Sequence, residues 1–259
     1  ILYFPASGMA VFQLQNNYKK NLMNKINLIG YGNWGKKIYL ILKDIKNIKI
    51  NILKKKDTLD RSSLDLILTN NETHYNLVKK SLMASNNVFC EKPLTTSISK
   101  ALKLYNFSEI IKKKIYVCDI ENFKNRKIKI KKINNIIRTK HSLIKDNILW
   151  RLAYHDLSYL YKHVKFKKLT NVKIIKSETG IMNFNLMFND VKFNFYYNLN
   201  KKTKKHFFND TNLVSPNDYY KKMLNNILSR KVDFIQNKEV SLFCIRIIEQ
   251  ILKINNKIN

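Results

Sequence analysis

The glycines of this chain are concentrated in one short segment. Of 5 glycines in 259 residues, three (Gly30, Gly32 and Gly35) form the pattern G-x-G-x-x-G. An alternating apolar stretch, residues 25–29, precedes them, and apolar residues at helical spacing follow. In such a unit the first glycine permits a tight turn, the second lets the backbone approach a pyrophosphate, and the third packs the helix on the strand. The segment therefore predicts a dinucleotide-binding turn, with a tight turn in a non-binding α/β domain as the alternative.

Short apolar segments alternate with helical patterns over the first half of the chain. The candidate strands cover residues 25–29, 48–53, 64–69, 87–93 and 115–119. This order is typical of a parallel sheet covered by helices on both faces. Between the second and third strands only about ten residues remain, which is too short for the usual crossover helix.

The second half of the chain has a different period. Residues 182–188 and 191–199 alternate apolar and polar side chains around Asn189 and Asp190, which predicts a β-hairpin with one buried face. Two amphipathic helical patterns follow, near residues 220–227 and 240–251.

The change of period near residue 120 predicts a domain boundary. We expect fold class α/β, with an N-terminal Rossmann-type parallel sheet in residues 23–119 and an α+β domain with an open antiparallel sheet in residues 120–259. The last helix can pack back on the first domain. Residues 1–22 are interpreted as an N-terminal extension.

The charge balance of the chain is unusual. With 49 Lys and Arg against 18 Asp and Glu, the formal net charge is +31. Clustered cations would suit a nucleic acid or an anionic membrane. Here the lysines spread over almost every segment, together with abundant Asn and Ile, which is typical of A/T-rich codon usage. We therefore expect no specific nucleic-acid or membrane partner, and a nucleic-acid-binding protein is the least favoured alternative.

The cysteines and several histidines show no metal-site spacing. Cys90, Cys118 and Cys244 are odd in number, which favours a reduced, cytoplasmic setting and predicts no metal site. We expect surface or capping roles for three histidines: His141, His163 and His206.

Four motifs, taken together, resemble one enzyme family. They are YGNWGKK (31–37), LTNNETHYNLVKKSL (68–82), VFCEKPLTTS (88–97) and NILWRLAYHDLSYL (147–160). Their order and spacing resemble the glucose-fructose oxidoreductase and inositol dehydrogenase family. The resemblance implies an NAD(P)-binding Rossmann domain and a second domain whose open sheet is often the oligomer interface.

The resemblance also implies roles for particular residues. Lys92 matches the lysine of the family's Glu-Lys-Pro motif, beside the nicotinamide and the substrate hydroxyl. His155 matches the histidine that takes the proton as hydride leaves the carbinol carbon. Oxidation of an alcohol needs both functions, one group to hold the oxygen and one to accept its proton. The implied cofactor-binding residues are Gly30, Gly32, Asn33, Trp34, Gly35, Thr69, Asn70, His74, Glu91, Lys92 and Pro93.

One position departs from the family pattern. The family usually has Asp four residues before the histidine, and this chain has Arg151. Because residues i and i+4 of a helix share a face, we expect Arg151 beside His155 and Lys92, where its charge disfavours protonation of the lysine. Arg151 either binds an anionic group of the substrate, with Glu91 and Asp156 as further substrate contacts, or marks a site that has kept binding and lost the reaction.

The end of the second predicted strand bears on the choice of cofactor. Lys54, Lys55 and Lys56 stand where an NAD-binding domain usually has a carboxylate for the adenosine ribose. A basic cluster suits the 2′-phosphate of NADP, and solvated lysines in a lysine-rich chain are an equally good explanation. The cofactor is therefore predicted as NAD or NADP.

These inferences lead to one functional hypothesis. We expect an NAD(P)-dependent oxidoreductase that acts on a hydroxyl or keto group of a sugar or nucleotide-sugar derivative, in polysaccharide biosynthesis. The resemblance implies a homo-oligomer formed through the C-terminal sheet. The alternative is a catalytically impaired family member that binds a dinucleotide or sugar without turnover.

Overall fold

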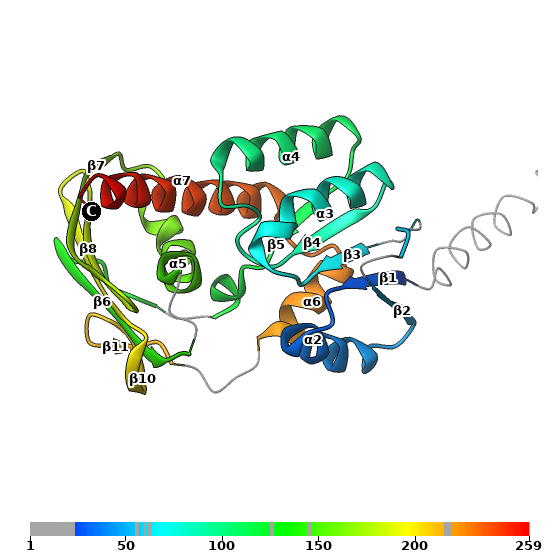
Figure 1. Cartoon of the computed structure of the whole chain (residues 1–259), viewed down its shortest axis with the longest axis horizontal. Helices are drawn as coiled ribbons and strands as arrows, with labels where there is room; N and C mark the ends of the chain where they lie inside the picture. Colours follow the sequence, from blue (N-terminus) through cyan, green and yellow to red (C-terminus); the bar gives the residue numbers. More distant parts are fainter. Residues whose placement is uncertain are drawn as a thin grey trace, which may run out of the picture.

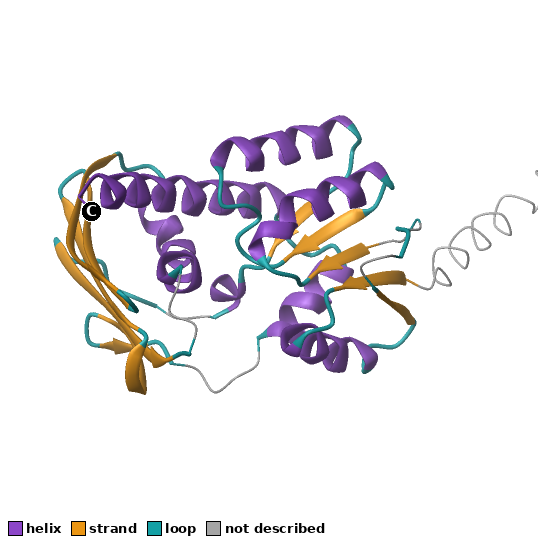
Figure 2. Ribbon diagram, viewed as in Figure 1, coloured by secondary structure: helices purple, strands orange, loops and turns teal. Residues whose placement is uncertain are grey.

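The protein contains two β-sheets joined by helices (Figures 1 and 2). The computed structural model describes residues 24–54, 57–59, 61, 64–124, 127–143, 147–214 and 219–258. The expected N-terminal extension, residues 1–22, lies outside these ranges, as do Lys55 and Lys56.

The first sheet has five parallel strands in the order β2-β1-β3-β4-β5. The strands are β1 (Asn24–Ile29), β2 (Ile48–Leu53), β3 (Leu64–Ile67), β4 (Asn87–Cys90) and β5 (Ile115–Val117). The helices between them are α2 (Asn33–Lys43), α3 (Asn71–Met83) and α4 (Ile98–Ile110). The predicted parallel sheet is confirmed. The described residues between β2 and β3 include no helix, as the short spacing led us to expect.

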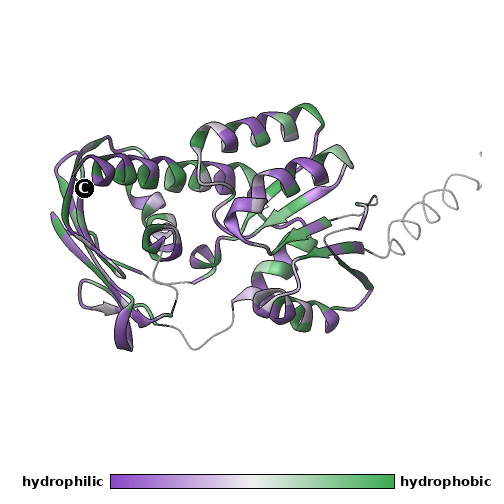
Figure 3. Ribbon diagram, viewed as in Figure 1, coloured by the Kyte–Doolittle hydropathy of each residue, from purple (hydrophilic) through white to green (hydrophobic). Residues whose placement is uncertain are grey.

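Helices cover both faces of this sheet, and β3, β4 and β5 are buried along almost their whole length (Figure 3). On one face, Val78 of α3 and Ala101 of α4 pack against Ile67 and Val117. On the other, Ile38 and Leu42 of α2 pack with residues of a helix from the C-terminal part of the chain, α6 (Tyr220–Leu228). The first domain thus completes its core with a distant segment.

The second sheet has six strands in the order β11-β10-β6-β9-β8-β7. They are β6 (Ile133–His141), β7 (Leu169–Glu178), β8 (Ile181–Phe188), β9 (Val191–Asn198), β10 (Asn200–Phe208) and β11 (Thr211–Asn212). The pairing of β6 with β9 is parallel and the other pairings are antiparallel, so the sheet is open and mixed rather than purely antiparallel. The expectation of an antiparallel sheet came from the one visible hairpin and missed the crossover to β6.

The predicted hairpin is confirmed as β8 and β9. Asn189 sits in the turn with φ of 51°, a left-handed conformation that Asn tolerates better than most residues. The inward side chains are buried, and the rings of Phe184 and Phe195 stack with centroids 4.6 Å apart. The alternation read from the sequence therefore marks the face that packs on the helices.

Four further elements lie between or against the two sheets. The short η1 (Ile120–Phe123) follows β5, the π-helical η2 (Leu149–Ala153) leads directly into α5 (Tyr154–Val164), and α7 (Phe234–Ile258) closes the chain. In Figure 1, α7 runs from the first domain to the second sheet, and it contacts α4, β5, α5 and β7. Glu249 of α7 accepts a hydrogen bond from the backbone N–H of Ile98 at the start of α4 (2.9 Å). One buried cluster extends through both domains, so they share a core. Among the described helices, none has the length and apolar character needed to cross a membrane.

Candidate active site

The glycine turn after β1 has the geometry that a dinucleotide requires. Gly30 has φ of +100°, and a Cβ built there would lie 2.7 Å from the carbonyl oxygen of Leu68. A Cβ on Gly35 would lie only 2.0 Å from the carbonyl oxygen of Gly30. At Gly32, by contrast, nothing lies within 4 Å of the added Cβ. The first and third glycines therefore serve the turn and the packing, and the second leaves the backbone open to a ligand.

The turn lies at the point where the strand order of the sheet reverses. β1 has β2 on one side and β3 on the other, so the carboxyl ends of β1 and β3 flank the switch point where open α/β sheets bind ligands. Asn33 begins α2, and Gly32, at its N-cap, makes no side-chain cap hydrogen bond. The N–H groups at this helix end are positioned to face an anion.

The loop after β3 forms the next wall of this edge. Thr69 accepts a hydrogen bond from the Thr73 hydroxyl (2.7 Å), and Asn70 is the exposed N-cap of α3. His74 is fully buried, with Nδ1 2.7 Å from the carbonyl oxygen of Pro93 and Nε2 3.0 Å from that of Thr69. His74 therefore ties the β3 loop to the β4 loop from beneath.

Trp34 and Glu91 connect the glycine turn to the end of β4. The Trp34 indole Nε1–H donates to Glu91 Oε1 at 2.9 Å, and Glu91 Oε2 accepts from the Lys92 backbone N–H at 3.0 Å. Trp34 also packs edge-on against Tyr220 of α6, with ring centroids 4.7 Å apart. These contacts hold the Glu91-Lys92-Pro93 segment against the first turn of α2.

Lys92 reaches from the first domain to the second. Its Nζ donates to the carbonyl oxygens of Trp150 (2.9 Å) and Arg151 (3.4 Å) in η2. Burial lowers the pKa of Lys92 to about 8; the Glu91 carboxylate opposes this shift and the positive charge of Arg138 adds to it. The ammonium is thus fixed at the carboxyl edge of the sheet and titrates much closer to neutrality than an ordinary lysine.

His155, in the first turn of α5, lies in the same polar region. Its side chain is 17% exposed, and Nδ1 is 3.8 Å from Oε1 of Glu121. Burial, followed by the charge of Lys92 and then of Arg138, lowers the pKa of His155 well below its ordinary value. At neutral pH the imidazole is therefore uncharged and has a lone pair free to accept a proton.

Asp156 is enclosed by three partners. Its carboxylate accepts from Arg138 (3.1 Å) and Tyr197 (2.9 Å), and it lies 2.7 Å from His206 Nε2. Burial raises the pKa of Asp156, but the charges of Arg138 and His206 outweigh it and hold the pKa below its usual range. His206 is buried in this network, so the surface or capping role expected for it is wrong; it points inward on β10, two residues before buried Phe208.

Arg151 does not follow the geometry of an ordinary helix. It lies in η2, where π-helical winding breaks the i to i+4 relation assumed for it. Its guanidinium donates to the Ser142 hydroxyl (2.9 Å), and its charge contributes to lowering the pKa of Lys140 on β6. The cation whose charge lowers the pKa of both Lys92 and His155 is Arg138.

The comparison with protein families concerns the first domain. Residues 43–117 match the model of an oxidoreductase family with an NAD-binding Rossmann fold, which is the glucose-fructose oxidoreductase and inositol dehydrogenase family. These residues are similar to that family, whose description names an NAD-binding fold, and the open backbone at Gly32 agrees with a dinucleotide cofactor. Among curated protein sequences, no relative matches the chain.

Solved structures of the same fold include several sugar-modifying enzymes. UDP-N-acetylglucosamine 3-dehydrogenase from Acidithiobacillus ferrooxidans aligns with a TM-score of 0.75 and 10% identity, over 89% of this chain and 97% of that one. The aldose-aldose oxidoreductase from Caulobacter crescentus aligns with a TM-score of 0.71 and 12% identity, over 91% and 98%. The WlbA dehydrogenase from Thermus thermophilus, in complex with NAD and UDP-GlcNAcA, gives 0.66 and 11%, over 86% and 94%. At these identities the likeness shows a shared fold.

Sequence motifs of the oxidoreductase family did not reveal three residues of this region. Glu121, Arg138 and His206 come from η1, β6 and β10, outside the four recognised motifs. A signal existed for His206, since it alternates with Phe208 on the inward face. Glu121 lies in a single 3₁₀ turn, which has no periodic pattern to read.

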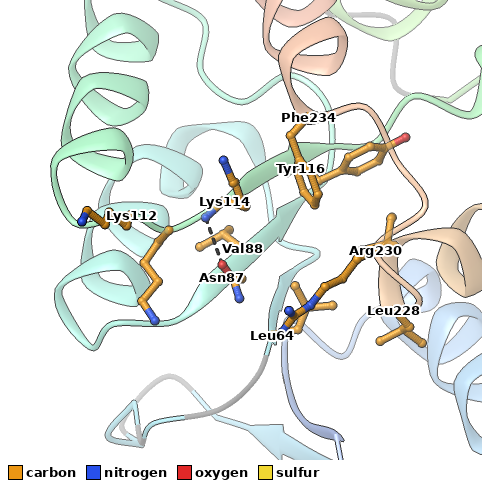
Figure 4. Close-up of a pocket in the computed structure, with 11 residues that line it drawn as sticks. Leu64, Asn87, Val88, Lys112, Lys114, Tyr116, Leu228, Arg230 and Phe234 are labelled. Carbon is orange, nitrogen blue, oxygen red and sulfur yellow. Dashed lines mark hydrogen bonds between the residues drawn. The ribbon is translucent and has the colours of Figure 1, made fainter. Parts of the chain in front are cut away.

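A cavity of about 410 Å³ opens at the opposite edge of the Rossmann sheet from the glycine turn. It lies at the amino ends of β3 and β4, and Figure 4 shows Lys112 and Arg230 on opposite sides of Val88. Lys112 follows α4, where cations favourably meet a helix C-terminus, so a structural role explains it. In the described residues, no group of three His, Cys, Asp or Glu side chains could hold a metal ion.

Proposed function

We propose that this protein is an NAD(P)-dependent oxidoreductase that interconverts a hydroxyl and a keto group on a sugar or nucleotide sugar. The observation that carries the proposal is the position of the Lys92 ammonium beside the second domain, next to the Trp34 and Glu91 bridge to the glycine turn. The charge of Lys92 contributes to lowering the pKa of His155, which supports a shared site.

The two side chains divide the proton chemistry between them. Lys92 is mostly protonated at neutral pH, since its pKa is about 8, and its N–H groups can hold the substrate oxygen. His155 is uncharged because burial keeps its pKa low. One of its ring nitrogens therefore has a lone pair that can accept the hydroxyl proton. When bound, the nicotinamide supplies the hydride acceptor or donor. In the reverse direction His155 returns the proton to the carbonyl oxygen.

The proposed substrate class is supported by the fold relatives and by the side chains near the candidate site. Fold relatives include enzymes of UDP-N-acetylglucosamine and of aldoses, which supports a sugar derivative and a role in polysaccharide biosynthesis. Arg151 remains our candidate for an anionic substrate group, since its guanidinium lies beside Ser142 and Lys140 at the end of β6. We assign Asp156 to positioning rather than substrate contact, because its oxygens already face three side chains.

The assembly and the setting of the enzyme are part of the same proposal. We propose a homo-oligomer formed through the outer face of the second sheet. We also propose a cytoplasmic setting, for which three buried cysteines without disulfides are the support.

The second candidate is a family member that binds a dinucleotide without turnover. Arg151 in place of the family's aspartate favours it. Two measurements separate the candidates: cofactor titration followed by Trp34 fluorescence, and NAD(P)H absorbance with a panel of nucleotide sugars, uronates and aldoses. Oxidoreductase activity predicts binding and turnover, with turnover lost in Lys92→Met while binding remains. Binding without turnover on any panel member supports the second candidate, and absence of binding contradicts both.

A further inference from the structure

The region around His155 is rich in positive charge. Lys92 from the β4 loop, Arg138 from β6, Lys124 after η1 and His206 from β10 all disfavour the protonated imidazole. A base that must take a proton here needs a nearby negative charge. The aspartate that the family provides one turn earlier is Arg151 in this chain.

The other carboxylates of this region already have hydrogen-bond partners. Asp156 is held by Arg138, His206 and Tyr197, and Glu91 by Trp34 and the Lys92 backbone. Asp119 accepts hydrogen bonds from the Ser158 hydroxyl and the Asn122 amide. Each of these groups is committed to positioning its own neighbours.

Glu121 also has a partner, Lys124, but it differs from the other carboxylates in making an ion-pair contact with His155. It is 4% exposed, at the start of the domain connection, and its Oε1 lies 3.8 Å from His155 Nδ1. Lys124 contacts the same carboxylate at 2.8 Å from the other end of the turn. Glu121 therefore lies between the imidazole of His155 and the ammonium of Lys124. The Lys124 side chain is itself 15% exposed to solvent.

We propose that Glu121 is the positioning carboxylate of the acid-base site and replaces, from a different element, the aspartate that Arg151 displaced. The inference rests on the proposed function. The Glu121 carboxylate, 3.8 Å from Nδ1 and so in electrostatic rather than hydrogen-bond contact, favours the tautomer in which Nδ1 carries the hydrogen and Nε2 presents its lone pair to the substrate. When hydride leaves the carbinol carbon for the nicotinamide, the O–H bond breaks and its proton goes to Nε2. The resulting imidazolium is paired with the Glu121 carboxylate, much as a triad aspartate supports its histidine.

The first test is the isosteric variant Glu121→Gln, which removes the charge and keeps the shape. We expect kcat to fall about 100-fold, within the range of general acid-base effects. The acid limb of the kcat/KM profile should move to lower pH, since the imidazolium loses its counter-charge. Lys124→Met should move that limb to higher pH, because it frees the Glu121 charge for His155. Glu109→Gln, an exposed carboxylate on α4, is the matched control.

The second test does not depend on turnover. Imidazole ¹⁵N shifts of the cofactor-free protein report the tautomer and pKa of His155, assigned by comparison with His155→Gln. We expect the Nδ1–H tautomer to dominate in the wild type and to lose its preference in Glu121→Gln, with Glu109→Gln unchanged. An identical tautomer and pKa in Glu121→Gln, in a variant that melts like the wild type, would overturn the inference. If no substrate is turned over but the tautomer shifts, the proposed function fails while the placement of Glu121 stands.

Discussion

Lys92 illustrates how a single residue can set the pH dependence of this enzyme. A free lysine stays charged up to about pH 10, but burial brings the pKa of Lys92 down to about 8. In the proposed reaction the protonated form holds the substrate oxygen, and this form predominates below about pH 8 and is lost above it. We therefore predict that kcat/KM for alcohol oxidation falls on the alkaline side with a midpoint near pH 8. Initial rates measured from about pH 6 to about pH 10 would locate this midpoint.

Two variants separate Lys92 from general effects of charge. Lys92→Arg keeps a positive group at all these pH values, so its residual activity should lack the alkaline limb. Lys103→Met removes an exposed lysine of α4 and should reproduce the wild-type profile. An alkaline limb that persists unchanged in Lys92→Arg would assign it to another group.

At the scale of elements, the β1–α2 turn separates binding from stability within one motif. Gly32 has φ of −75° and open space at its Cβ position, so Gly32→Ala should fold with a stability change of about 1 kcal/mol or less. It should weaken NAD(P) binding about tenfold or more, because the methyl group fills the space left for the pyrophosphate. Gly35→Ala should instead destabilise the protein by about 3–5 kcal/mol, since its Cβ would lie 2.0 Å from the Gly30 carbonyl oxygen. Chemical denaturation and cofactor titration measure the two effects. Wild-type affinity in Gly32→Ala would contradict this assignment.

The elements of the fold differ in how well the sequence predicts them. Strands of the first sheet and the β8–β9 hairpin were predictable, because burial on two faces or one leaves a continuous or alternating apolar pattern. β10 escaped notice since its outward lysines mask the inward His206 and Phe208. The candidate site could be proposed from the sequence where it followed family motifs. Arg151 was placed by a regular helical period that η2 does not have, and the proximity of Glu121 to His155 arises only when η1 meets α5.

At the scale of the whole molecule, the central strands of the second sheet are poor in charge on their outer side. The outward side chains of β6, β8 and β9 include Ile133, Ile137, Met187 and Tyr196, with Lys192 as their lysine, whereas Lys173 and Lys176 of β7 and Lys205 of β10 flank them on the same face. Ile133 is 56% exposed and Tyr196 42%. With a net charge of +31, copies of the chain repel each other, and this charge-poor strip adds little to that repulsion, which favours it for the proposed self-association.

We therefore predict that a negative charge introduced on the outer side of these strands dissociates the proposed homo-oligomer. Tyr196→Glu should convert the protein to monomers, as measured by sedimentation velocity, because it buries a carboxylate in the interface. Leu40→Glu, an equally drastic change at an exposed site on α2, should leave the assembly intact. A wild-type protein that sediments as a monomer, or a Tyr196→Glu protein that does not change, would contradict the prediction.

The docking of α6 on the first sheet has a consequence for biosynthesis. Met223, Leu224 and Ile227 cover the same face as α2, so that face stays partly open until the ribosome has translated α6. A nascent chain that already contains the glycine turn and all five parallel strands still lacks part of their cover. The first sheet therefore reaches its finished packing only after α6 has been made, and premature stop codons before α6 should yield products that chaperones and proteases recognise.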